Sequence, residues 1–138
     1  MSIQPRGGRF KGDFFTITLN FTGIPNTTQQ FAPIYGSTFS GTETNVDVTN
    51  DLPFTIRRLR VVTTDNSVTG NTVVEFRRNA ATVTSRTVAT TVVGETATGI
   101  LSIPILEGDL INWALTVTDG AANVVSGMGY LVCQRTIE

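Results

Sequence analysis

Between residues 13 and 22 apolar and polar residues alternate, and this pattern restricts the possible fold more than any other in the sequence. Successive side chains of a β-strand point to opposite faces, so a period of two predicts a strand with one buried face. A helix requires a period near 3.6, and no segment of ten or more residues shows one. The expected inward residues are Phe15, Ile17, Leu19 and Phe21.

The rest of the chain favours strands as well. Of the 138 residues, 24 are threonine, 15 valine and 10 isoleucine, together more than a third of the sequence. Side chains branched at Cβ pack well on a pleated sheet and are less suited to helices. Further strands are expected at residues 45–49, 53–64, 72–79, 82–93, 101–105, 111–117 and 124–134, with a short strand or loop at 31–41.

Several local features refine this pattern. The inward phase slips at Arg57 and Arg58, where a β-bulge would restore it. Pro104 lacks a backbone N–H, so it predicts a bulge or an unpaired edge position for its strand. Residues 79–81 predict a tight turn and residues 94–99 a loop. About eight or nine strands with this spacing are typical of an antiparallel sandwich or barrel.

The length fits one domain, and we expect a single β-sandwich domain over residues 13–138. Residues 1–12 contain Arg6, Arg9 and Lys11 spaced by glycines, without a hydrophobic pattern, so they predict a flexible basic N-terminal arm. No apolar run is long enough to cross a membrane. No apolar segment follows the basic N-terminus, so we expect no signal peptide and synthesis in the cytoplasm.

The chain contains no histidine and a single cysteine, which removes most catalytic and metal-binding arrangements. Without histidine, the usual general base at neutral pH, the Ser-His and Cys-His pairs and the commonest zinc ligand are missing. Cys133 ends an apolar run and Trp113 lies on an apolar strand face, so both are interpreted as core residues. Glu107 and Asp109 flank a glycine and fit a β-turn better than a catalytic or calcium site. We therefore expect no enzyme, no cofactor and no metal.

The charged residues nearly balance, with ten basic and eleven acidic residues and a net charge of −1, which argues against nucleic-acid binding. Nine of the basic residues are arginines, which suit planar contacts at interfaces better than lysine does. Two arginine clusters lie on strands expected to be neighbours. They allow two interpretations: an interface patch for carboxylates or phosphates of a partner, or solvated faces paired with acids such as Glu75, which we favour. The clusters consist of Arg57, Arg58 and Arg60, and of Arg77 and Arg78.

Five segments between residues 58 and 118 are informative in combination. Residues 58–61 (Arg-Leu-Arg-Val) open a strand, and residues 72–79 form a strand that ends in an Arg-Asn turn. A strand rich in threonine and valine follows, and within residues 103–111 a Gly-Asp pair opens a strand that leads into residues 113–118. This order resembles the jelly-roll modules of phage particles that are similar to the C1q and tumour-necrosis-factor fold. The sequence departs from them at the usual Asn-Gly turn, which is Asn-Ala here.

The resemblance implies an all-β, antiparallel β-sandwich of jelly-roll type and a homotrimeric protein of the virion surface. The implied function is a capsid decoration (cement) protein that stabilises the shell, or a head-fibre module. The implied partner is the major capsid protein or another virion component, and Arg6, Arg9 and Lys11 would anchor the arm to the shell.

Two other function classes stay open. A carbohydrate- or receptor-binding module of a phage fibre would need exposed aromatic side chains beside aspartate and asparagine on loops, and the chain has two tyrosines and one tryptophan. An enzyme on a β-scaffold such as a cupin is poorly supported because histidine is absent.

Overall fold

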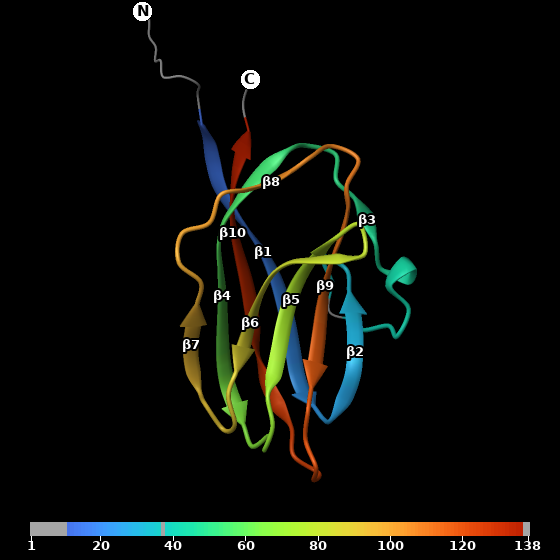
Figure 1. Ribbon diagram of the computed structural model, residues 1–138, viewed down its shortest axis with the longest axis vertical. Coiled ribbons are helices and arrows are strands. Elements are labelled where there is room, and N and C mark those ends of the chain that lie inside the picture. Colours follow the sequence, from blue (N-terminus) through green and yellow to red (C-terminus); the bar gives the residue numbers. More distant parts are fainter. Residues whose placement is uncertain (1–10, 37, 137–138) are drawn as a thin grey trace, which may run out of the picture.

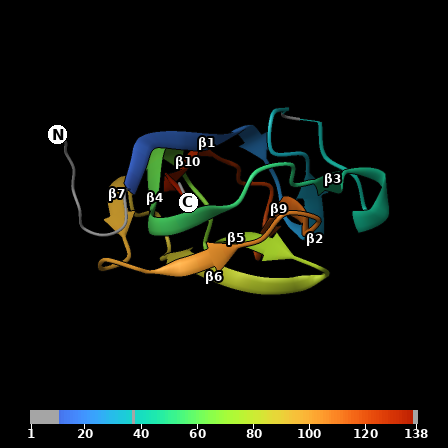
Figure 2. The same cartoon turned by 90° about the horizontal axis from the view of Figure 1, so that it is seen from above.

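The structure is a computed structural model that describes residues 11–36 and 38–136. Two β-sheets pack face to face, and both ends of the described chain lie at the same end of the sandwich (Figures 1 and 2). Sheet A contains β1 (Lys11–Ile24), β10 (Val125–Thr136), β4 (Phe54–Asn66), β7 (Gly94–Ala97) and β8 (Ile103–Ile105). Sheet B contains β2 (Thr27–Ala32), β3 (Val48–Thr49), β9 (Leu110–Val117), β5 (Thr72–Arg78) and β6 (Ala81–Val88). A short 3-10 helix, η1 (Glu43–Asn45), lies between β2 and β3.

The strands pair as in a long antiparallel hairpin whose two arms, from the chain ends to the middle, are wrapped into two sheets. β1 pairs with β10, β2 and β3 pair with β9, β4 pairs with β7 and β8, and β5 pairs with β6, all antiparallel. β2 and β3 share one edge position beside β9, and β7 and β8 share one beside β4, so the ten strands fill eight positions. The expected antiparallel sandwich of jelly-roll type is therefore confirmed, with two of its strands interrupted.

The alternation that predicted the first strand matches its burial. Ile17, Leu19 and Phe21 are buried between the sheets, whereas Thr16 and Asn20 are exposed. The core that they join contains residues from both sheets. Trp113 is fully buried at its centre and meets Phe76 edge to face, with ring centroids 5.5 Å apart. Such pairs of aromatic rings add to the free energy gained from burying their apolar surface.

The bulge expected in the long strand is present. Val132 pairs with Arg58 and the next residue, Cys133, pairs with Ile56, so Arg57 is the extra residue of β4. The bulge returns Leu59 to the core after Ile56. Pro104 lies in β8, which pairs with β4 at the edge of sheet A, so the edge position expected for it is also confirmed.

Several expected boundaries were wrong. The strand expected over residues 82–93 ends at Val88 as β6, and residues 89–93 form a turn. β7 (Gly94–Ala97) lies where a loop was expected, because β4 offers a free edge with which it pairs from Arg60 to Thr63. Local composition predicts such pairing poorly, since strand formation depends on the neighbouring strand. β1 begins at Lys11, which pairs with Thr136, so the last two residues of the expected arm belong to the strand.

Candidate functional site

The two arginine clusters lie on different sheets. β4 carries Arg57, Arg58 and Arg60 in sheet A, and β5 carries Arg77 and Arg78 in sheet B. The expectation that their strands are neighbours was therefore wrong. The chain crosses from sheet A to sheet B between β4 and β5. The alternation of residues within each strand does not indicate to which sheet the strand belongs.

Arg77 is held in a network of charged and aromatic side chains. Its Nε and Nη2 donate to the two carboxylate oxygens of Glu43 at 2.6 and 3.1 Å, and its Nη1 lies 3.5 Å from Glu75 Oε1. Its guanidinium also lies over the ring of Phe31. The hydrogen bonds with Glu43 raise the pKa of Arg77 against the opposing effect of burial. The interpretation of this arginine as paired with acids, Glu75 included, is confirmed.

The remaining arginines of the clusters differ in their partners. Arg60 forms an ion pair with Glu95 and lies over the ring of Tyr130. Arg57 Nη1 donates to Ser102 Oγ at 3.2 Å, and Arg78 Nη1 donates to the carbonyl oxygen of Pro104 at 2.7 Å. Arg58 differs from them, because its Nε is buried and has no hydrogen-bond partner among the described residues.

Arg58 belongs to the solvent-facing side of sheet A, which we call the outer A face. Antiparallel partners point to the same side of a sheet, so the register identifies its members. From β10 to β4 the partners are Val132 with Arg58, Tyr130 with Arg60, and Met128 with Val62. From β1 to β10 they are Thr16 with Val132, Thr18 with Tyr130, and Asn20 with Met128.

The centre of the outer A face is apolar. Met128, Tyr130 and Val132 form a half-buried row along β10, with threonine and asparagine on one side and Arg58, Arg60 and Val62 on the other. An apolar centre bordered by arginine and other polar side chains is typical of protein interfaces.

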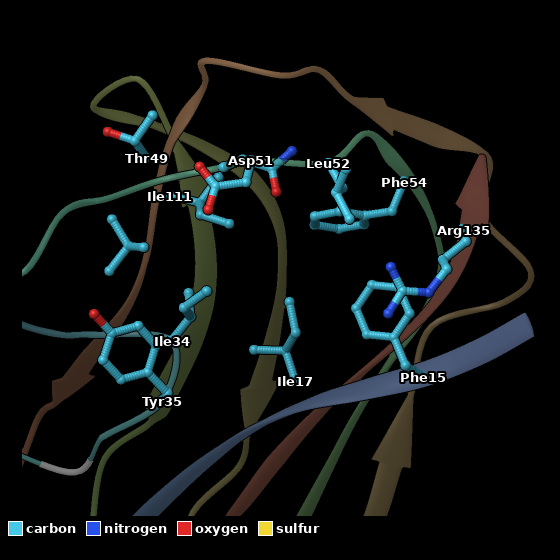
Figure 3. A pocket seen from close by; sticks show the side chains of 12 residues that line it. Phe15, Ile17, Ile34, Tyr35, Thr49, Asp51, Leu52, Phe54, Ile111 and Arg135 are labelled. Atoms are coloured by element: carbon cyan, nitrogen blue, oxygen red, sulfur yellow. The ribbon is translucent and has the colours of Figure 1, made fainter. Parts of the chain in front are cut away.

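A groove opens between β1 and the segments that precede β3 and β4, and we call it the β1 groove (Figure 3). Its volume is about 320 Å³, within the usual range for ligand sites. Figure 3 shows Phe15 and Ile17 pointing into it from β1, with Ile34 and Tyr35 on one side and Leu52 and Phe54 on the other. The remaining lining residues are Val48, Thr49, Asn50, Asp51, Ile111 and Arg135.

The polar groups of the β1 groove lie at its margins. The Arg135 guanidinium lies over the Phe15 ring, 5.4 Å from the ring centroid. Tyr35 is 78% exposed, and Asp51 is exposed as well. No hydrogen bond or ion pair of the Asp51 side chain occurs within residues 11–36 and 38–136. The groove therefore combines an apolar floor with one free carboxylate.

The side chains that were interpreted as structural lie as expected. Gly108 has a φ of 92° in the turn between Glu107 and Asp109, so the β-turn is confirmed. Asp109 accepts hydrogen bonds from the Leu106 N–H and from Asn79, and the first of these contributes most to lowering its pKa. Cys133 is buried, and desolvation raises the pKa of its thiol to about 12.

The expected anchor residues are described only in part. Arg6 and Arg9 lie outside the described residues, and for Lys11 only the backbone is described, in β1. Within the described ranges no three histidine, cysteine, aspartate or glutamate side chains are grouped as a metal site would require. The same part of the chain has no helix of the length and hydropathy that a membrane span needs.

Of the outer A face, only Arg58 and Arg60 were identified from the sequence as candidate interface residues; its apolar row and the β1 groove were not expected. A usable signal for the first is the run Met128–Cys133, which is apolar on both strand faces apart from a glycine, unlike the alternating β1. The groove has no such signal, because Tyr35, Asp51 and Arg135 come from three distant segments.

Two comparisons with known proteins found no match. A scan against protein-family models finds no match, and a search of curated proteins finds no similar sequence. The resemblance to phage jelly-roll modules therefore stays a prediction.

Proposed function

We propose that the protein is a non-enzymatic structural component of a virion surface. In this proposal it acts as a homotrimeric capsid decoration (cement) protein or as a head-fibre module, bound to the major capsid protein or another virion component. It is made in the host cytoplasm and becomes part of the particle. Three observations support the proposal: the motif order of residues 58–118, the jelly-roll pairing of the strands and the character of the outer A face.

The outer A face supports the part of the proposal that concerns self-association. A monomer would leave the row of Met128, Tyr130 and Val132 in contact with water, and burial of apolar surface is the main favourable term in most protein association. Arg58 lies half-buried beside this row, and arginine suits planar contacts with carboxylates of a partner. Packing of copies of the chain through this face would bury the apolar row.

Light scattering of the full chain tests this step by counting subunits. We expect three subunits for the natural sequence and one for Val132→Lys, which adds a cation beside Arg58 in the centre of the face. Val73→Lys is the matched control, because Val73 is a half-buried valine on the solvent-facing side of sheet B, between Thr116 and Thr87. The control should remain trimeric, and circular dichroism should show strand structure in all three proteins.

A monomeric natural sequence would refute the proposed trimer. A trimer that persists in Val132→Lys would place the interface elsewhere and remove the argument from the outer A face.

The virion assignment needs a separate experiment, with purified particles of the virus that encodes the sequence. We expect mass spectrometry to find the protein in the particles, and binding of recombinant protein to stripped particles to fall when residues 1–10 are deleted. The deletion ends before Lys11, since β1 begins there. Undiminished binding after the deletion would rule out Arg6 and Arg9 as the anchor, and absence from particles would overturn the virion assignment.

One observation favours a second candidate, a carbohydrate- or receptor-binding module. Tyr35 is exposed on a loop and lines the β1 groove together with Asn50 and Asp51, which is the combination of aromatic and polar groups that this function requires. A glycan array tests it: binding that is lost in Tyr35→Ala would support this candidate, and no binding to any glycan would reject it.

A further inference from the structure

The β1 groove continues along the strand as a longer channel. A second cavity of about 570 Å³ is lined by Thr16, Thr18, Asn20 and Gly36, together with three residues of the β1 groove. The three shared residues are Ile17, Ile34 and Tyr35. The two cavities therefore follow β1 from Phe15 to Asn20.

This part of β1 is an unpaired sheet edge. β1 is the last strand on its side of sheet A, and among the described residues its ladder partner is β10 alone. In an edge strand every second residue directs its N–H and C=O away from the sheet, and these groups can pair with another extended chain. The channel along β1 leaves room for such a chain beside the strand.

The chemistry of the walls indicates what kind of chain would fit. The floor at Phe15, Ile17 and Ile34 would accept apolar side chains at alternate positions of an added strand. The carboxylate of Asp51 is exposed at the margin and forms no ion pair among the described residues, since Arg135 of the same groove lies over Phe15 instead, so it would pair with a basic side chain of the added segment. Few polar side chains converge on the floor, which favours a peptide over a sugar.

We propose that the β1 groove binds an extended segment of a partner protein, which adds to sheet A as a strand along the free edge of β1. The segment has apolar residues at alternate positions and a lysine or arginine opposite Asp51. Main-chain hydrogen bonds supply much of the affinity, and the apolar floor and Asp51 supply selectivity, as in other cases of strand addition. The proposal requires neither a trimer nor a virion.

The probe is the blocked peptide acetyl-Lys-Val-Thr-Val-Thr-Val-Thr-amide, titrated into the full chain. We expect saturable binding with slower hydrogen exchange at alternate backbone amides between Phe15 and Asn20. Two further peptides are N-methylated at every second residue, one at the odd and one at the even positions. The peptide whose methylated nitrogens face β1 should bind about tenfold more weakly, because it cannot donate hydrogen bonds to the strand. The other peptide keeps these donors and should bind like the unmethylated one.

Two variants of the protein test the proposed pairing of Asp51 with a basic residue of the peptide. Asp51→Lys should weaken binding of the lysine peptide several-fold and favour a peptide with glutamate in its first position. Asp65→Lys is the control, because Asp65 is also exposed but pairs with Ser126 near the other end of β4. It should leave binding unchanged, and neither position is in the core.

Three results would overturn the proposal. The first is that the peptide does not bind at a concentration of about 1 mM. The second is that the unmethylated peptide and both N-methylated peptides bind equally well. The third is that the peptide binds without protecting the β1 amides from exchange. Binding of a glycan that protects the β1 amides from exchange, without any binding of the peptide, would assign the groove to a sugar instead.

Discussion

Asp119 joins three loops at the end of the sandwich opposite the chain termini. Its Oδ1 accepts from the N–H of Thr69 at 3.1 Å and also from the Thr69 hydroxyl. Its Oδ2 accepts from the N–H of Asn123 at 3.0 Å, and its own N–H donates to Asn26 Oδ1 at 2.8 Å. The bonds that the carboxylate accepts from Thr69 and Asn123, the one from the Thr69 hydroxyl above all, lower the pKa of Asp119 from 3.8 to about 2.

The lowered pKa predicts a pH dependence of stability. Because the folded pKa of about 2 lies below the ordinary 3.8, the ionised Asp119 stabilises the fold in full above about pH 4. This contribution is lost as the pH falls through 2. We expect Asp119→Ala to lower the thermal midpoint by several degrees at pH 7 and far less at pH 2, measured by circular dichroism. An equal loss at both pH values would contradict this account, and Asp65→Ala serves as an exposed control.

Ala80 has a backbone conformation that suits glycine. Asn79 and Ala80 form the two-residue loop between β5 and β6, with φ values of 51° and 64°. Hairpins of this kind prefer Asn-Gly, because an alanine in the left-handed region costs about 1–2 kcal/mol. Replacing Ala80 by glycine would remove this cost. Glycine loses more conformational entropy on folding, which costs about 0.4–1 kcal/mol and cancels part of the gain.

We therefore expect Ala80→Gly to raise the free energy of unfolding by up to about 1 kcal/mol in urea denaturation. Ala81→Gly, one residue later and at the start of β6, is the control and should lower it by up to about 0.5–1 kcal/mol. A destabilised Ala80→Gly variant would show that the turn tolerates alanine without strain.

β10 requires glycine at positions that face the core. It lies between β1 and β4 and pairs with both along most of its length. A Cβ at Gly129 would lie 3.3 Å from Val74 Cγ1 and 3.4 Å from the Trp113 ring, so this glycine makes room for the tryptophan. At Gly127 a Cβ would overlap the carbonyl oxygen of Val62, a backbone atom that cannot move without disturbing the sheet.

The overlap makes Gly127→Ala a test of the packing of this strand. We expect the variant to lose roughly 1–3 kcal/mol of unfolding free energy in urea denaturation, as overpacked sites do. Gly120→Ala is the control, since a Cβ there meets nothing within 4 Å. Equal stability of the two variants would mean that β10 can shift away from β4 at little cost.

At the scale of the whole molecule, the jelly roll buries one face of each sheet and leaves the other to solvent or to a partner. If the outer A face holds a trimer together, folding and assembly are linked by mass action. A tenfold increase in protein concentration then stabilises each subunit by about 1 kcal/mol, which raises the thermal midpoint by a few degrees.

We expect this concentration dependence for the natural sequence and for Val73→Lys, and we expect it to vanish in Val132→Lys. Calorimetry across a hundredfold range of concentration would measure it. A midpoint that is independent of concentration in the natural sequence would contradict the trimer.

The sequence determined the local features of this protein because each depends on neighbouring residues. Alternation identified β1 and its buried face, the phase slip at Arg57 and Arg58 located the bulge, and the missing N–H of Pro104 identified an edge. The core positions of Trp113 and Cys133 followed from the same pattern. All of these depend on side-chain direction and backbone chemistry over a few residues.

Only the tertiary structure decided what lies beside what. β7 formed where a loop was expected because β4 supplied a partner, and the arginine clusters separated because β4 and β5 belong to different sheets. The β1 groove joins Tyr35, Asp51 and Arg135 from distant segments, and the outer A face depends on the register of β10 against two neighbours. A period along the chain determines which side of a strand is buried, whereas the sheet, the neighbour and the register follow from closing the whole core.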